Sequence, residues 1–217
     1  DTVLLLTDNQ IANTSDVTIS SSGLLDLNGN VDTIGTVTMT GAMIDTGVGG
    51  DIATGNITVN ASATASTISG TYTLVGTRTI TVIDGTANPD LLVSAVIEGA
   101  GGVTVNNLSG GARVDFSGAN TYSGLTTLSN GFLYVNNPSG LGASAGGTVL
   151  AGGNLTISGV TISGEGLTII ATSVLQGTGA SGWTGPIVLN ANLSLLTPGT
   201  LALSRATRGT GGVTKTS

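Results

Sequence analysis

The sequence predicts an all-β fold, and within that class a β-solenoid, in which each short strand pairs with the equivalent strand one coil above and below. Three observations lead to this prediction: short apolar/polar alternations fill the chain, no segment carries a helical stripe, and aromatic residues are scarce. Gly accounts for 36 of the 217 residues, and Thr, Ser and Asn together for about a third. This composition disfavours helices, because each Gly costs a helix about 1 kcal/mol relative to Ala.

Alternation with a period of two predicts half-buried strands. The clearest segments are rich in Val, Ile, Leu and Thr, and turns containing Gly, Asn and Ser separate them. They are Val17–Ser20, Leu24–Asn28, Thr36–Thr40, Asn56–Asn60, Thr79–Ile83, Gly102–Val105, Asn154–Ser158, Gly166–Ile170, Pro186–Asn190 and Thr200–Ser204.

The few aromatic residues argue for a narrow interior. Sandwiches and small barrels usually fill a thick core with aromatic side chains, whereas a thin core of Val, Ile, Leu and Ala fits a solenoid. At roughly 20 residues per coil, residues 1–217 would form one solenoid of about ten coils. The aromatic residues are Tyr72, Phe116, Tyr122, Phe132, Tyr134 and Trp183.

Composition also excludes several functions. A net charge of −7 with only five Lys and Arg residues argues against nucleic acid as a partner. The chain has no His and no Cys, which removes imidazole acid–base catalysis, thiolate nucleophiles, disulfides and the usual zinc sites. Apolar runs are about five residues long at most, so we expect no membrane insertion of this segment.

One segment carries a resemblance to a known family. Residues Gly99–Gly142 include SGANTYSGLTTLSNGFLYVNNPSGLG at Ser117–Gly142, which resembles the autotransporter-associated β-strand repeat. That repeat reads as a strand, S-G-A-N-T-Y-x-G, T-T-x, x-x-G-x-L-x-V-N and a closing L-G. Ser15–Gly41 resembles its linking coils, and Gly209–Ser217 resembles the start of a further repeat. The strand before the motif departs from the pattern, because it carries Arg113 and Asp115 where the family is apolar and Thr-like.

The resemblance implies a right-handed parallel β-helix exported to a bacterial cell surface. We therefore expect a secreted, non-enzymatic structural protein, either a stalk or a fibre subunit of the autotransporter-passenger or adhesin type. Two alternatives stay open: a carbohydrate-binding or carbohydrate-cleaving β-helix, and an ice-binding solenoid. A surface glycan or a protein is the ligand expected of an adhesin.

The two ends of the sequence lack an evident cap. Unpaired strands at the ends of a solenoid template further pairing. We therefore expect either continuation in a longer chain or end-to-end association of copies. The candidate residues for this contact are Val3, Leu4, Leu5, Leu6, Val213 and Thr214.

Acidic residues are the candidates for catalysis and for calcium binding. Asp26 with Asp32, and Asp84 with Asp90, flank turns, but a glycosidase needs two carboxylates roughly 5–10 Å apart, and the single Lys lies at position 215. We expect no cofactor. Ca²⁺ is the one ion that the oxygen-rich turns would suit. Those turns contain Asp8 with Asn9, Asp26 with Asn28 and Asn30, and Asp45 with Asp51.

Two further patterns concern outward positions of strands. Arg113 and Asp115 lie two apart and so share a face; we expect an ion pair that is solvated or reaches a neighbouring coil. Thr-x-Thr occurs at Thr36–Thr40, Thr71–Thr73 and Thr77–Thr81. The uneven gaps between these segments argue against the regular ladder that ice binding needs.

Overall fold

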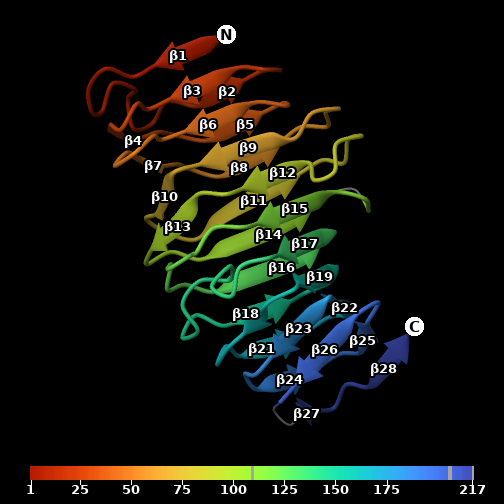
Figure 1. Cartoon of the computed structure of the whole chain (residues 1–217). Helices are drawn as coiled ribbons and strands as arrows, with labels where there is room; N and C mark the ends of the chain where they lie inside the picture. The colour runs from red at the N-terminus through yellow and green to blue at the C-terminus, as the bar shows by residue number, and fades with distance from the viewer. Residues whose placement is uncertain (109, 205–206, 217) are drawn as a thin grey trace.

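The computed structural model describes residues 1–108, 110–204 and 207–216, and these form a stack of parallel strands with no helix. All strand pairings are parallel, as in Val17–Ile19 with Val37–Met39. Figure 1 shows an elongated stack that starts at the red N-terminal strand and ends at the blue C-terminal strand. The predicted β-solenoid is confirmed.

Two long sheets run the whole length of the stack. The first, sheet A, has 11 strands, which gives about eleven coils rather than the predicted ten. Its strands are β1 Thr2–Leu4, β3 Leu24–Asp26, β6 Met43–Asp45, β9 Ser66–Ser69, β12 Leu91–Val93, β15 Arg113–Phe116, β17 Phe132–Val135, β19 Asn154–Ser158, β22 Ser173–Thr178, β25 Leu193–Leu196 and β28 Val213–Thr216. Sheet B consists of β2 Val17–Ile19, β5 Val37–Met39, β8 Ile57–Val59, β11 Arg78–Val82, β14 Val103–Asn107, β16 Thr126–Asn130, β18 Thr148–Leu150, β21 Leu167–Ile169, β24 Ile187–Leu189 and β27 Thr207–Gly209.

The third face of the coil is split into two short sheets. Sheet C covers the N-terminal coils and comprises β4 Val31–Thr33, β7 Asp51–Ala53, β10 Thr71–Leu74 and β13 Val96–Gly99. Sheet D covers the C-terminal coils and comprises β20 Thr161–Ile162, β23 Ala180–Trp183 and β26 Thr200–Leu203. Between them the chain crosses this face without a strand at residues 117–125 and 136–147, and most of these residues belong to the family-like segment Ser117–Gly142.

The core is a column of inward side chains in register from coil to coil. Leu91 pairs with Val114, Val114 with Leu133, Leu133 with Leu155, and Leu155 with Leu175. All five are fully buried. Burying such a side chain contributes about 1.5–3 kcal/mol, so the aliphatic ladder is a main source of stability.

The aromatic residues divide into two groups. Tyr72, Phe116, Tyr122 and Trp183 lie inside the coils and are at most 1% exposed, so the interior is not purely aliphatic. The polar groups of these aromatic side chains are hydrogen-bonded: Tyr72 Oη with Thr54 Oγ1 at 2.9 Å, Tyr122 Oη with Thr126 Oγ1 at 2.6 Å, and Trp183 Nε1 with the Glu165 carbonyl oxygen at 2.9 Å. Phe132 and Tyr134 instead point outward from β17 and are half-buried.

Candidate functional site

Four of the predicted self-association residues, Val3, Leu4, Val213 and Thr214, lie on the first and last strands of sheet A, and Leu5 and Leu6 directly follow β1. β1 pairs on one edge with β3, and β28 pairs on one edge with β25; the described strands leave the other two edges unpaired. Val3, Leu4 and Leu6 are 60%, 49% and 70% exposed. Leu5 differs, because it is buried and its N–H bonds the Asp26 carbonyl oxygen at 2.8 Å.

The C-terminal members of that group are also accessible. Val213 is 47% exposed, and Thr214 is exposed as well. The structure therefore places every predicted self-association residue except Leu5 on an accessible surface at an end of the same sheet. A hollow of about 650 Å³ adjoins the N-terminal group and is lined by Val3, Val17 and Ile19 among others.

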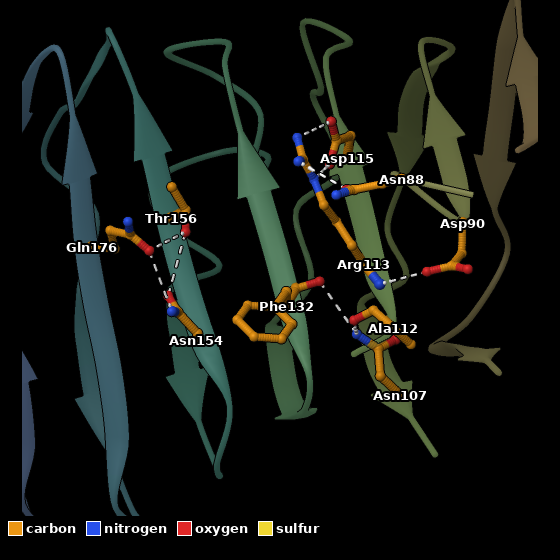
Figure 2. A network of polar contacts seen from close by, with 10 residues as sticks. All are labelled: Asn88, Asp90, Asn107, Ala112, Arg113, Asp115, Phe132, Asn154, Thr156 and Gln176. Carbon is orange, nitrogen blue, oxygen red and sulfur yellow. Dashed lines mark hydrogen bonds and ion pairs between the residues drawn. The ribbon is translucent and has the colours of Figure 1, made fainter. Parts of the chain in front are cut away.

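Arg113 and Asp115 form a preorganised cluster on the outer face of sheet A (Figure 2). Arg113 Nε donates to Asp115 Oδ1 at 2.6 Å, and Nη2 donates to Oδ2 at 2.7 Å. Nη1 donates to Asn88 Oδ1 at 3.1 Å, and the guanidinium lies 3.6 Å from the centroid of the Tyr134 ring. The pair thus lies within one strand, and bidentate geometry plus ring stacking makes it more ordered than the expected solvated pair.

The buried Asp90 fixes the loop beside this cluster. Its Oδ1 accepts from Gly85 N at 2.8 Å, and its Oδ2 accepts from Arg113 N at 2.9 Å. Asp90 therefore ties the β11–β12 loop, which carries Asn88, to the start of β15. Asn107, which is fully buried, makes a second tie by donating through Nδ2 to the carbonyl oxygens of Ala112 at 2.9 Å and Phe132 at 3.2 Å.

Among the described residues, Glu165 is the one acid that is buried next to a hollow at the gap between sheets C and D. Its side chain is 2% exposed, and its Oε1 accepts from Thr148 Oγ1. Burial raises the pKa of Glu165 to about 7, although the Thr148 hydrogen bond opposes that rise. The hollow has a volume of about 400 Å³ and is lined by hydroxyl groups, including those of Thr121, Ser139 and Ser144.

Most of the acids that are candidates for catalysis or calcium binding accept hydrogen bonds from backbone N–H groups. Asp26 Oδ1 accepts from Asn28 N at 2.8 Å, Asp8 Oδ1 accepts from Val31 N at 2.8 Å, and Asp45 Oδ1 accepts from Gly47 N at 3.1 Å. Asp32 is buried and its Oδ2 accepts from Gln10 N and Ile11 N. Within the described ranges, no three or more Asp and Glu side chains gather as a metal site would require.

The Thr residues of sheet B align better than their spacing indicated. Thr18 pairs with Thr38, Thr38 with Thr58, and Thr58 with Thr81, which places four outward hydroxyls in one column. Coils of different length hide this alignment in the sequence. The next residue in the column is Asn106.

Sequence reasoning missed Glu165 and the pairing of Phe132 with Asn154 across coils. The Gly-Glu-Gly context of residue 165 gives no signal of burial. Phe132 and Tyr134 alternate with Leu133 and Val135, and the period of two could have identified both aromatics as outward.

Comparisons with protein-family models, with curated proteins and with solved structures find no match to this chain. The resemblance to the autotransporter-associated repeat therefore stays a prediction. No helix able to cross a membrane occurs in residues 1–108, 110–204 and 207–216.

Proposed function

We propose that this chain is a non-enzymatic structural segment of a secreted bacterial surface protein, serving as a stalk or a fibre subunit of the autotransporter-passenger or adhesin type. The observation that carries the proposal is the unbroken parallel register of sheet A over 11 strands. A solenoid gains length at constant width, because each coil templates the next. The family-like segment Ser117–Gly142 supports the cell-surface role.

We further propose that the open edges of β1 and β28 are covered in the assembled protein, either by further coils or by a second copy stacked head to tail. Leu24 N bonds the Asp1 carbonyl oxygen, and Leu5 N bonds that of Asp26. In a parallel pair, alternate residues bond one neighbour, so the N–H groups of Thr2 and Leu4 point to the open edge. These groups can accept a further strand by main-chain hydrogen bonding.

Analytical ultracentrifugation over a wide concentration range tests both parts of the proposal. We expect an elongated particle whose mass rises with concentration. Leu4→Pro should abolish that rise, because it removes an edge N–H without removing a bond to β3. Leu4→Thr is the matched control, since it keeps the N–H and the strand preference. A compact particle would contradict the stalk, and a monomer at every concentration would contradict stacking of copies.

The column of four Thr residues is the observation on which the ice-binding alternative rests. Its continuation by Asn106 limits the regular array to part of sheet B. A thermal-hysteresis measurement is the direct test, and the structural proposal does not depend on its result.

A further inference from the structure

A second surface of interest lies on the outer face of sheet A, on the coils from β15 to β25. Arg113, Phe132, Asn154, Val174 and Ser194 occupy the same outward position on five consecutive strands. Coils follow one another at about 4.8 Å, a spacing close to the length of one sugar ring. We call these five residues the Phe132 column.

Two hollows lie on either side of Phe132. The larger has a volume of about 370 Å³ and runs along the column from Phe132 through Asn154 and Val174 to Ser194. The smaller has a volume of about 140 Å³ and lies between Phe132, Arg113, Tyr134 and Asn88. The larger volume is at the lower end of the range for small-ligand sites, about 300–1,000 Å³.

Phe132 is the aromatic surface available to a ligand. Arg113 already stacks on Tyr134 at 3.6 Å, whereas Phe132 is half-buried and lines both hollows. Figure 2 shows its ring projecting between the Arg113 cluster and Asn154. An aromatic ring held on a rigid strand gives apolar contact at little cost in conformational entropy.

Planar polar groups continue the surface beyond the ring. Asn154 Nδ2 donates to Gln176 Oε1 at 3.3 Å, and Thr156 Oγ1 lies 3.3 Å from Asn154 Oδ1 and from Gln176 Oε1, which share its one proton. Among the described residues, Gln176 Nε2 donates to no protein acceptor, so it can donate to a ligand. Asp115 neutralises Arg113, which leaves this face without net charge.

We propose that the Phe132 column binds a neutral saccharide chain lying along the solenoid axis. The C–H face of one sugar would pack on Phe132, and the amides of Asn154 and Gln176 would bond its hydroxyl groups. The neutral lining favours an uncharged polyhydroxylated ligand over an anionic polymer, which would need unpaired cations. The site does not depend on the stalk role, and it needs no catalytic step.

Affinity electrophoresis in native gels tests the proposal, because the chain carries a net charge of −7 and migrates readily. Parallel gels would contain dextran, galactomannan, hydroxyethyl cellulose, alginate or no polysaccharide. We expect retardation by at least one of the three neutral polymers. Phe132→Leu should weaken that retardation about fivefold or more, because it keeps the apolar bulk and removes the ring face.

Asn154→Ala provides a second variant that leaves the ring in place, and it should also weaken retardation. Thr127→Ala is the matched control, since Thr127 points outward from sheet B on the same coil as Phe132; it should bind as the unaltered chain does. Circular dichroism would establish that each variant is folded. The proposal is overturned if only alginate retards the chain, if no polymer does, or if both Phe132→Leu and Asn154→Ala bind normally.

Discussion

At the residue scale, the gap between sheets C and D contains a buried titratable group in an otherwise sparsely charged molecule. Only 8% of the residues are charged, and Glu165 is held inside the coil by Thr148. Desolvation disfavours the ionised carboxylate, so the folded state retains a proton that the unfolded chain releases more easily. This acid therefore links stability to pH in the direction opposite to that of a salt-bridged acid.

We expect Glu165→Gln to change how stability depends on pH. The pKa of Glu165 is about 7 in the folded chain, against an ordinary value of 4.5. Between these values the unfolded state binds fewer protons, so the stability is full below pH 4.5 and falls as pH rises towards 7. The fall is at most about 3 kcal/mol, and access of water through the adjoining hollow reduces it.

Urea denaturation at pH 5 and pH 8 measures this effect. The unaltered chain should lose more stability between the two pH values than Glu165→Gln, which cannot ionise. Asp16→Asn is a control at an exposed site, where hydrogen bonds from Thr36 lower the pKa of the Asp16 carboxyl group. The stability that Asp16 adds is lost only as the pH falls through the acid range. Asp16→Asn should therefore leave the difference in stability between pH 5 and pH 8 unchanged. An equal loss in Glu165→Gln and the unaltered chain would contradict the burial argument.

At the element scale, the alternation of apolar and polar residues was sufficient to locate many strands. Segments such as Asn154–Ser158 and Pro186–Asn190 coincide with β19 and β24. The strands of sheet C were harder to find, because Val31–Thr33 and Asp51–Ala53 have three residues each and contain Asp. The register could not be predicted either, because the number of residues per coil varies. Fewer residues separate the paired Thr18 and Thr38 than separate the paired Thr58 and Thr81.

The close approach of neighbouring coils predicts that Gly→Ala substitutions at two positions differ sharply in their effect on stability. A Cβ at Gly185, just before β24, would lie 1.5 Å from the Glu165 carbonyl oxygen, whereas a Cβ at Gly166, just before β21, meets nothing within 4 Å. We expect Gly185→Ala to destabilise the folded chain by about 1–3 kcal/mol, because the backbone of the neighbouring coil must move away from the added methyl group. Gly166→Ala should be neutral or slightly stabilising.

The denaturation midpoints of the two variants, compared with that of the unaltered chain, provide the measurement. Both substitutions add one methyl group just before a strand of sheet B, so the two variants differ mainly in the space available to that methyl group. Equal midpoints for Gly185→Ala and Gly166→Ala would show that the coils can separate at this position without cost. That result would contradict the tight backbone packing described above.

At the scale of the whole molecule, charge is distributed unevenly along the stack. The first 51 residues contain seven Asp and no Lys or Arg, whereas the last 52 contain two Arg, one Lys and no acid. Because the coils are stacked in sequence order, this asymmetry runs along the length of the molecule (Figure 1). A head-to-tail contact would bring a negative end to a positive end, which favours association.

This polarity predicts that stacking of copies weakens with salt and with charge reversal at one end. Arg208 lies on β27, the last strand of sheet B, in the same outward column as Thr127, Val149, Thr168 and Val188.

Arg208→Glu should weaken association up to about fivefold at low salt, which is the effect of losing one exposed ion pair. The difference between the variant and the unaltered chain should shrink at 0.5 M salt, where the Debye screening length is about 4 Å. Thr127→Glu, on β16 in the middle of sheet B, should have a smaller effect, because it lies several coils from both ends. Sedimentation equilibrium at the two salt concentrations measures all three proteins. Association that is unchanged by Arg208→Glu, or that strengthens with salt, would contradict a contribution of charge to the stacking of copies.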